Sequence, residues 1–205
     1  MAYLILVRHG ESVWNKQDLW TGLTDVSLSE KGKEESQKAG ELIKSDLIGF
    51  KIDEAYSSPL KRSTETFDEI VRVLGYQVPL TVNKALNERD YGQLTGKNKW
   101  ELKKEYGEEK FQKIRRAWDY EIPGGETLKD VYNRVVPYYE NEILPKLKNG
   151  KNILIVAHGN SLRSLVKFLE NISDENIASL EIPTGGVYIY QIDNEGKIIS
   201  KEIKD

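Results

Sequence analysis

The chain of 205 residues contains no cysteine, so it has no disulfide and no thiolate for catalysis or metal binding. Long apolar runs are also missing, because the stretches at 4–7 and 153–157 are far shorter than the roughly 20 residues of a membrane-spanning helix. There is no basic surplus either, since 30 Lys and Arg residues stand against 33 Asp and Glu residues. We therefore expect neither a membrane nor nucleic acid as a partner, but a local basic site for a small anion is compatible with this composition.

The composition, with 39% hydrophobic and 31% charged residues, is that of a soluble globular protein. Met1 leads directly into a strand pattern without a basic stretch or cleavage site, so we expect no secretory signal. Together with the missing cysteines, this favours a cytoplasmic location. The sequence leaves a monomer, a homodimer and a homotetramer open.

Short apolar runs alternate with amphipathic segments along the chain, a pattern typical of an α/β protein with a mainly parallel sheet. We expect a three-layer α/β/α sandwich with an antiparallel edge. The predicted strands cover residues 3–7, 54–57, 80–82 and 153–157, with an edge hairpin formed by 187–191 and 197–203. The predicted helices are 29–47 with Ser29 as cap, a segment ending at Leu74 before Gly75, 127–147 with a Thr127–Asp130 cap and a bend at Pro137, and a segment starting near Ser161.

The sequence shows no low-complexity stretch, no fixed repeat and no linker, so we expect one domain over residues 1–205. Residues 87–118 interrupt the alternation of strands and helices, because this stretch is rich in polar, aromatic and charged residues. We interpret this stretch as an insertion of loop and short helices that contributes to a substrate site.

The chain has only two histidines, and each directly follows a buried apolar strand. His9 comes after residues 4–7 and Arg8, and His158 comes after residues 153–157. Ligand sites of open α/β sheets lie beyond the carboxyl ends of parallel strands. If the two strands are neighbours, His9 and His158 project into one crevice, where the glycine after each allows close approach of a ligand.

Three interpretations of the histidine pair stay open at this point. Each imidazole could simply pack at a strand end, or the pair could bind a metal ion. The fixed positive charge of Arg8 next to His9 would repel a cation, and no third ligand stands at a recognisable metal spacing. Phosphoryl transfer fits better, because Arg8 can bind phosphate oxygens bidentately and a neutral imidazole is a competent nucleophile. Arg62, in the first turn of the helix after residues 54–57, could be a second phosphate ligand or a solvated helix charge.

The elements around the two histidines resemble the histidine phosphatase superfamily and, within it, the bisphosphoglycerate-dependent phosphoglycerate mutases. The resemblance covers nearly the whole chain, so chance matching of the ordered set is improbable. It is carried by Leu6-Val7-Arg8-His9-Gly10-Glu11-Ser12 with Asn15, Thr21-Gly22, Leu60-Lys61-Arg62, Leu86-Asn87-Glu88-Arg89, Tyr91-Gly92, Asn98-Lys99, Arg115-Arg116, Ala157-His158-Gly159-Asn160-Ser161 and Ile182-Pro183-Thr184-Gly185.

The resemblance implies a phosphoglycerate mutase-like fold and interconversion of 3-phosphoglycerate and 2-phosphoglycerate, without a metal. It implies that 2,3-bisphosphoglycerate phosphorylates His9, that Arg8, Arg62 and His158 hold the phosphoryl group, and that Glu88 is the general acid and base. Small phosphorylated metabolites are then the partners. The remaining substrate-binding residues implied are Ser12, Asn15, Thr21, Gly22, Arg89, Tyr91, Lys99, Arg115, Arg116, Gly159 and Asn160.

A second anion site separates a mutase from a simple phosphatase, since a mutase must hold a bisphosphorylated intermediate at both ends. Residues 87–118 supply Arg89, Lys99, Arg115 and Arg116 for this purpose. Other interpretations are a solvated helix face for Arg115 and Arg116, and a surface salt bridge between Glu88 and Arg89. A phosphomonoester phosphatase and a non-catalytic binding protein are the rival functions.

The chain departs from long members of the family at two places. A segment is missing between Arg116 and the Pro123-Gly124-Gly125 stretch, and the sequence lacks the mobile tail that follows the last strand in longer relatives. Because such a tail would help to exclude water from a phosphohistidine, its absence bears on the lifetime of the phosphoenzyme and on self-association.

Overall fold

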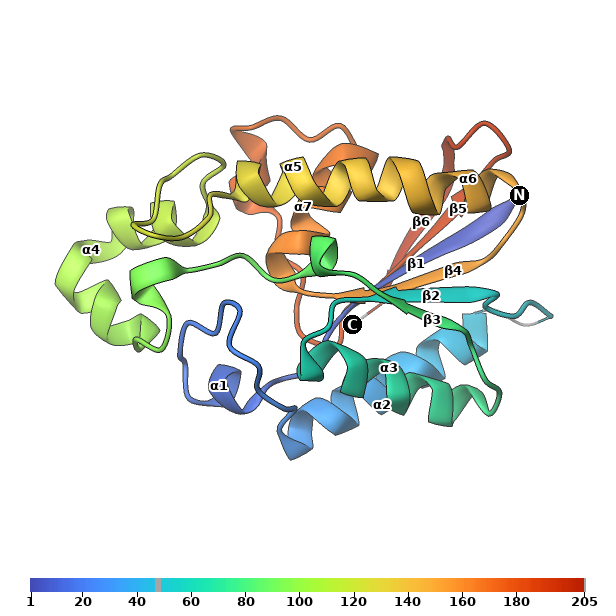
Figure 1. The fold of residues 1–205 in the computed structure, drawn as a ribbon, viewed down its shortest axis with the longest axis horizontal. Helices are drawn as coiled ribbons and strands as arrows, with labels where there is room; N and C mark the ends of the chain where they lie inside the picture. The colour runs from blue at the N-terminus through green and yellow to red at the C-terminus, as the bar shows by residue number, and fades with distance from the viewer. Residues whose placement is uncertain (47–48, 205) are drawn as a thin grey trace.

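A computed structural model describes residues 1–46 and 49–204, which form a sheet with helices on both faces (Figure 1). The order of the strands across the sheet is β3-β2-β4-β1-β5-β6. The first four pair in parallel, while β5 and β6 are antiparallel, so the predicted mainly parallel sheet with an antiparallel edge is confirmed. The strands are β1 (Ala2–Arg8), β2 (Glu54–Ser57), β3 (Leu80–Val82), β4 (Ile153–Ala157), β5 (Val187–Ile192) and β6 (Ile198–Lys204).

Two layers of helices cover the sheet, with α2 and α3 on one face and α5, α6 and α7 on the other (Figure 1). The described helices are α1 (Val13–Lys16), α2 (Glu30–Asp46), α3 (Lys61–Leu74), α4 (Lys99–Arg116), α5 (Leu128–Tyr138), α6 (Leu144–Lys148) and α7 (Gly159–Leu169). Short 3₁₀ segments are η1 (Lys84–Leu86), η2 (Gly92–Leu94) and η4 (Asn176–Ser179), and η3 (Tyr139–Ile143) is a π-helical turn.

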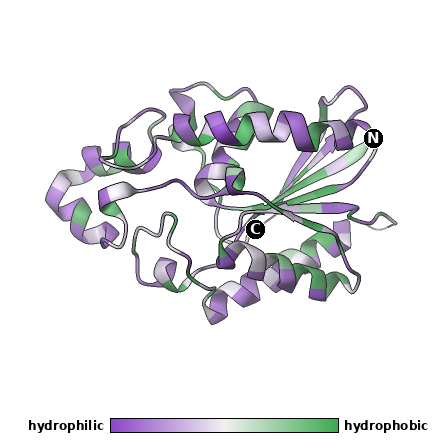
Figure 2. Cartoon of the chain, in the orientation of Figure 1, coloured by the Kyte–Doolittle hydropathy of each residue, from purple (hydrophilic) through white to green (hydrophobic). Residues whose placement is uncertain are grey.

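The apolar strands of the sequence are the central strands of the sheet, and both of their faces are covered. In β1, Leu4 and Leu6 pack into the cluster beneath α5 and α7, whereas Ile5 and Val7 pack into the cluster beneath α2 and α3. Successive side chains of a strand point to opposite faces, so a strand buried on both sides needs a continuous apolar run. Figure 2 shows the corresponding hydrophobic colouring at the centre of the molecule.

The helix boundaries follow the predicted signals closely. Gly75 ends α3 in a left-handed conformation with φ 79°, and Thr127 and Asp130 form a reciprocal capping box at the start of α5. The predicted interruption of the long helix lies at the π-helical turn η3, just after Pro137, whose missing N–H weakens the regular hydrogen-bond ladder there. The helix predicted over residues 29–47 corresponds to α2, and its predicted last residue, Leu47, lies outside the described residues.

Residues 87–118 form η2 and the 18-residue helix α4, which projects beyond one end of the sheet (Figure 1). Gly107, with φ 77°, breaks α4 into two helical halves, so the expected short helices are joined at this glycine. Beneath α4 lies a third apolar cluster, which includes Trp20, Leu102 and Phe111. Aromatic residues of the polar stretch are therefore the core that fastens α4 to the rest of the chain.

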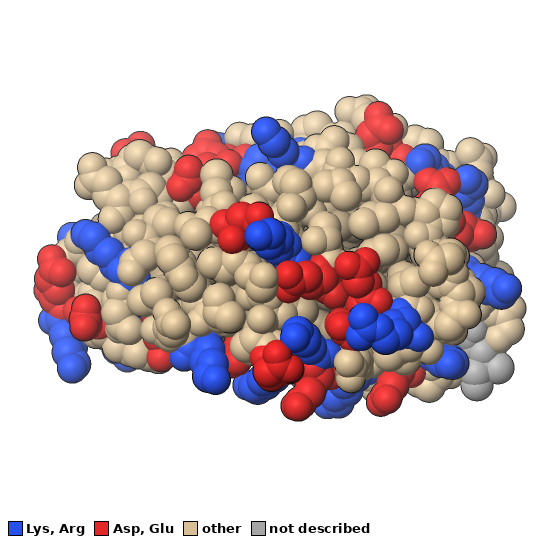
Figure 3. Space-filling view, turned by 60° about the horizontal axis from the view of Figure 1, so that its bottom comes forward, with Lys and Arg blue, Asp and Glu red and all other residues tan. Residues whose placement is uncertain are grey.

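The surface carries charges of both signs. On the face drawn in Figure 3, acidic and basic side chains are interspersed rather than gathered into one large field of a single sign. Among the described residues, no helix is both long and apolar enough to cross a membrane.

Two glycines allow α2 to pass directly behind the turn that follows β1. A Cβ added to Gly10 would lie 2.1 Å from the carbonyl oxygen of Gly32, and a Cβ added to Gly32 would lie 2.0 Å from the carbonyl oxygen of Glu11. These distances lie far inside van der Waals contact, so both positions require glycine. The start of α2 therefore supports the turn that carries His9.

We expect Gly32→Ala to destabilise the fold by about 1–3 kcal/mol, because the new methyl group must push the Glu11 backbone away. Urea unfolding measures this change as a lower transition midpoint. Glu34→Ala, on the exposed side of the same helix, is the matched control and should change the free energy of unfolding by no more than about 0.5 kcal/mol. A Gly32→Ala protein as stable as the control would contradict the close approach of these backbones.

Candidate active site

A cleft of about 680 Å³, including its open mouth, lies at the carboxyl ends of β1 and β4. Its walls come from both strand ends, from α1 and the loop after it, from the start of α3, from the loop between η1 and η2, from α4, from the start of α7 and from the loop between η4 and β5. The lining residues are Arg8, His9, Asn15, Leu19, Trp20, Thr21, Gly22, Arg62, Glu88, Tyr91, Lys99, Arg115, Arg116, Gly159, Asn160, Arg163, Glu181 and Ile182.

The two imidazoles lie side by side, with ring centroids 5.0 Å apart and ring planes at 61°. The register of the parallel pair β1–β4 aligns Arg8 with Ala157, so the residue after each strand reaches the same level. The backbone N–H of His9 also donates to the Ala157 carbonyl at 2.9 Å. Pairing of two strands distant in sequence thus brings the histidines together, as expected.

The tautomer of His9 is set by its own neighbour. Its Nδ1 lies 2.6 Å from the carbonyl oxygen of Gly10. A carbonyl oxygen can only accept, so Nδ1 carries the proton and Nε2 carries the lone pair. His9 also lines the cleft, which makes Nε2 the nitrogen available for bond formation.

Both imidazoles are held in the neutral form. Burial lowers the pKa of His9 well below its ordinary value of 6.5, and the nearby charges of Arg62 and Arg8 lower it further. Burial also lowers the pKa of His158, again followed by the charge of Arg62. The same guanidinium groups that can bind an anion therefore keep His9 unprotonated and nucleophilic.

The arginines at the floor of the cleft are fixed by backbone carbonyls. Arg62 is only 1% exposed and donates to the carbonyl groups of Thr24 and Gly22, each at 2.8 Å. Arg8 donates from Nη1 to the Ile182 carbonyl at 2.6 Å. Burial lowers the pKa of Arg62 to about 10, which leaves the group charged at neutral pH. Arg62 is thus a buried cation of the cleft, and the interpretation as a solvated helix charge is wrong.

Several buried donors of the lining residues have no acceptor among the described residues. They are Arg8 Nε, Trp20 Nε1, Thr21 Oγ1 and Arg163 Nε. A buried polar group without a partner is costly, so a ligand rich in oxygen acceptors fits this cleft well.

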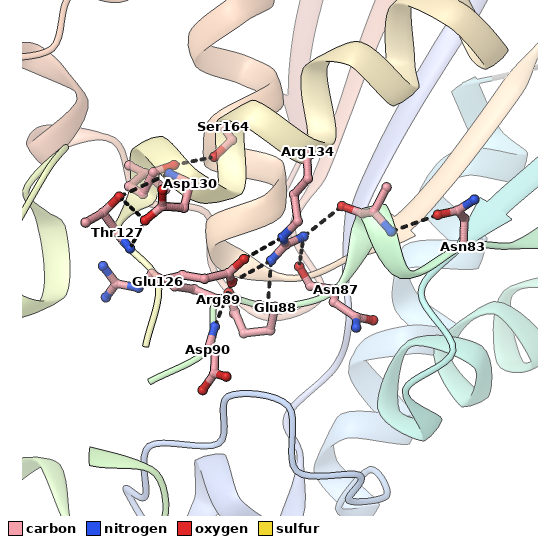
Figure 4. A network of polar contacts seen from close by, with 12 residues as sticks. Asn83, Asn87, Glu88, Arg89, Asp90, Glu126, Thr127, Asp130, Arg134 and Ser164 are labelled. Carbon is pink, nitrogen blue, oxygen red and sulfur yellow. Dashed lines mark hydrogen bonds and ion pairs between the residues drawn. The ribbon is translucent and has the colours of Figure 1, made fainter. Parts of the chain in front are cut away.

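Glu88 is buried and is held in place from both its backbone and its side chain. Its Oε1 accepts from the backbone N–H of Arg89 at 2.7 Å and of Asn160 at 3.1 Å. Arg134 Nη2 donates to the Glu88 carbonyl at 2.9 Å and is itself anchored by Glu126 (Figure 4). The second oxygen, Oε2, lies 3.7 Å from the position of a Cβ built on Gly159, on the lining of the cleft.

The predicted alternative of a surface salt bridge between Glu88 and Arg89 is wrong. The Arg89 guanidinium turns away, donates to the Ile114 carbonyl at 2.7 Å and lies 4.6 Å from the Tyr91 ring centroid. Of Arg89, it is the backbone N–H that contacts the Glu88 carboxylate, not the guanidinium. The carboxylate is therefore free to serve the cleft.

A second group of cations comes from the two ends of α4. Lys99 is its first residue, and Arg115 and Arg116 are its last two. All three line the cleft, so the interpretation of Arg115 and Arg116 as a solvated helix face is wrong. Burial, followed by the charges of Arg8 and Arg115, lowers the pKa of Lys99 to about 8.

Three residues of the predicted site lie behind the cleft wall rather than on it. Ser12 is the N-cap of α1, and its hydroxyl accepts from Asn15 N and donates to Asn15 Oδ1, so it orients the Asn15 side chain. Arg89 is buried under Tyr91, and His158 packs beside His9 with its Nε2 2.7 Å from Ser58 Oγ. The Ser12 and Arg89 side chains thus contact their neighbours, and the buried Nδ1 of His158 has no partner among the described residues, so the predicted phosphoryl contact of His158 stays a prediction.

Sequence reasoning missed five lining residues, namely Leu19, Trp20, Arg163, Glu181 and Ile182. Arg163 is the most connected, since it donates to Asn160 Oδ1 at 2.9 Å and to the carbonyls of Arg116 and Ile177. Its spacing of three residues from Asn160 places both on one face of α7, which is a signal that the sequence does contain. Within 1–46 and 49–204, no group of three or more His, Cys, Asp or Glu side chains is arranged to hold a metal ion.

We expect neither histidine to titrate between about pH 6 and about pH 8 in the folded protein, because burial and two arginines disfavour the imidazolium form. NMR of the ring C–H groups measures this directly, and His9→Ala assigns both signals because the chain has only two histidines. In the unfolded state the two histidines bind protons near pH 6.5, whereas in the folded state they do not. The free energy of unfolding should therefore fall as the pH drops below that value. A ring signal that titrates near pH 6.5 in the folded protein would contradict this electrostatic account.

Comparison with known proteins agrees with the geometry of the cleft. Residues 4–203 match the family model of the histidine phosphatase superfamily, branch 1. A 2,3-bisphosphoglycerate-dependent phosphoglycerate mutase from Parvibaculum lavamentivorans is 46% identical over 201 residues, which cover 98% of this chain and 95% of the relative.

Solved structures share the fold at lower sequence identity. The YhfR protein of Bacillus stearothermophilus superposes with a TM-score of 0.82 at 24% identity, over 97% of this chain and 94% of that chain. A mycobacterial glucosyl-3-phosphoglycerate phosphatase superposes with a TM-score of 0.78 at 21% identity, over 100% and 98% of the two chains. From the match over nearly its whole length, the chain belongs to the histidine phosphatase superfamily.

Proposed function

We propose that this chain is a phosphoglycerate mutase that interconverts 3-phosphoglycerate and 2-phosphoglycerate through a phosphohistidine at His9. The observation that carries the proposal is that cations from two parts of the fold line one cleft together with His9, and we treat them as two poles. The proximal pole consists of Arg8 and Arg62 around His9, and the distal pole consists of Lys99, Arg115 and Arg116 on α4. The sequence relatives that bear the mutase name support the same assignment.

At the proximal pole, Nε2 of His9 is the nucleophile towards phosphorus. When the Nε2–P bond forms, positive charge develops on the ring, and the Gly10 carbonyl that accepts from Nδ1–H stabilises it. Arg8 and Arg62 neutralise the phosphoryl oxygens, and the amide NH₂ of Asn15 adds a neutral donor, since its Oδ1 is already bound to Ser12. We assign to His158 the support of the His9 ring.

Glu88 is the proposed general acid and base. In transfer from His9, the Nε2–P bond breaks as the substrate hydroxyl oxygen bonds to phosphorus, and Glu88 accepts the hydroxyl proton. In the return step, the bond between phosphorus and the other ester oxygen breaks as Nε2 attacks, and Glu88 gives the proton back to that oxygen. The N–H bonds from Arg89 and Asn160 to Oε1 fix the carboxylate so that Oε2 is the atom that exchanges the proton.

The distal pole holds the end of the ligand that does not react. Lys99, Arg115 and Arg116 supply charge, and Thr21, Gly22, Tyr91, Gly159 and Asn160 complete the proposed binding surface. Arg89 contributes indirectly by supporting the Tyr91 ring, and Ser12 contributes by orienting Asn15. A single-phosphate hydrolase needs only the proximal pole, so the second pole favours the mutase.

The site fits 2,3-bisphosphoglycerate as the priming group, because its two phosphates match two cationic poles and its oxygens offer acceptors to the unpaired donors of Arg8 and Thr21. When bound, this compound supplies the phosphoryl group that the enzyme needs for its first turnover. We also propose that residues 1–205 form one domain in which residues 87–118 carry the distal pole.

We expect mutase activity that depends on 2,3-bisphosphoglycerate and persists in EDTA, measured as formation of 2-phosphoglycerate from 3-phosphoglycerate. Incubation with the bisphosphate should place acid-labile phosphate on the wild type and none on His9→Ala, since no other side chain of the cleft is a neutral imidazole with a free Nε2 facing the ligand. Glu88→Gln should still acquire the label, but both labelling and turnover should slow by about 10²–10⁴-fold, because both steps lose their proton transfer while His9 stays intact.

Each rival function has its own outcome in this experiment. Hydrolysis of phosphomonoesters without isomerisation would identify a phosphatase. Binding of the bisphosphate without any label would identify a non-catalytic binding protein. Loss of activity in EDTA would point to a metal-dependent reaction.

The lowered pKa of Lys99, about 8, predicts that affinity for 3-phosphoglycerate falls between about pH 7 and about pH 9. As the pH rises through this value the lysine loses its charge, and the distal pole loses one cation. Calorimetric titration should show a weakening in wild type that Lys99→Arg abolishes, because a guanidinium stays charged over the whole range. Lys104→Arg, at an exposed position of the same helix, should keep the wild-type profile; an identical profile in Lys99→Arg would refute the assignment.

A further inference from the structure

Glu181 is the acidic residue of the cleft that the proposed reaction does not use. It lies between η4 and β5, and its Oε1 is 2.7 Å from Nη2 of Arg116. The Glu181 side chain is 64% exposed, whereas that of Arg116 is 17% exposed. A carboxylate at the rim of the cleft therefore reaches inward to a cation of the distal pole.

The main chain on both sides of this ion pair is fixed. Arg163 donates to the carbonyls of Arg116 and Ile177, at 2.9 Å and 2.8 Å. Beyond Glu181, the Ile182 carbonyl accepts from Arg8 at 2.6 Å. Separation of the pair thus requires only rotation of the exposed Glu181 side chain, without movement of a helix or a strand.

The carboxylate is chemically equivalent to the group that a ligand would place at the same spot. A hydrogen bond from Arg116 lowers the pKa of Glu181, and the charges of Arg116, Arg115 and Arg8 lower it further. Glu181 is therefore ionised at neutral pH. It occupies Nη2 of Arg116, a donor that could otherwise bind carboxylate or phosphate oxygens of a ligand, while Nη1 of the same group donates to the Leu180 carbonyl at 3.4 Å.

We propose that Glu181 is a specificity-determining residue that competes with the distal anionic group of the ligand for Arg116. This inference rests on the proposed function, because it takes the distal pole as the place of that anionic group. A ligand with two anionic ends displaces Glu181 from Arg116 into solvent, so part of its binding free energy is lost. A ligand that fills only the proximal pole leaves the ion pair intact.

Two probes separate these cases in calorimetric titrations of the full chain at low ionic strength. 3-Phosphoglycerate engages both poles, whereas orthovanadate places vanadium where the transferring phosphorus stands at His9. We expect Glu181→Gln, which keeps the shape and removes the charge, to bind 3-phosphoglycerate about two- to fivefold more tightly. Vanadate affinity should stay unchanged, and the gain for 3-phosphoglycerate should shrink in high salt.

The matched control is Glu195→Gln, which removes the same charge at the turn before β6, where Glu195 pairs with Lys197. It should leave both affinities unchanged. Binding of 3-phosphoglycerate by Glu181→Gln that is equal to or weaker than that of the wild type overturns the inference. An equal change in affinity for both probes also overturns it, because it would indicate that Glu181 only stabilises the loop between η4 and β5.

The mutase activity of the wild type, measured in parallel, distinguishes failure of the inference from failure of the proposed function. An active enzyme whose Glu181→Gln variant gains no affinity rejects the inference alone. An inactive wild type whose variant shows the selective gain rejects the function and keeps the competition at Arg116. Failure of both proteins to bind 3-phosphoglycerate rejects both.

Discussion

The site depends on the parallel pairing of β1 with β4, because this pairing alone brings the two ends of the chain's most apolar runs to one level. His9 and His158 follow these strands directly, so their 5.0 Å ring separation is a consequence of strand register. The strands are buried on both faces, and a register slip would expose their apolar side chains to the wrong layer. The core that stabilises the sheet therefore also holds the nucleophile in place.

Around this pair, the fold concentrates cations with few compensating acids. Arg62 and Arg163 are buried, and their donors are satisfied mostly by backbone carbonyls rather than by carboxylates. Carbonyl dipoles fix a guanidinium without cancelling its charge, so the cleft stays attractive to anions. The same charges keep the imidazoles neutral. The arginines that attract an anionic ligand therefore also keep His9 in its nucleophilic form.

Much of this organisation follows from sequence, and the exceptions have identifiable physical causes. The predicted strands 54–57, 80–82 and 153–157 match the observed bounds. For 153–157 the reason is that a continuous buried apolar run bounded by turn residues has few alternatives. The break at Gly107 and the apolar cluster beneath α4 were not foreseen, since that cluster joins Trp20 to Phe111 across distant chain positions. Similarly, the sequence does not indicate whether the side chains of Ser12 and Arg89 face the cleft or a neighbouring residue. Their contacts with Asn15 and Tyr91, seen only in the structure, decide this.

The apolar cluster beneath α4 has a consequence for the length of molecule that the cleft accepts. The proximal pole comes from the end of β1, which carries Arg8, and from the first turn of α3, which carries Arg62, whereas the distal pole is built on α4, which projects beyond the sheet. Trp20, Leu102 and Phe111, none of which carries charge, belong to the apolar cluster that packs α4 against the rest of the chain. A change in the volume of these side chains would move α4 and its three cations relative to His9, and so change the length of ligand that the cleft accepts without the loss of any charged group.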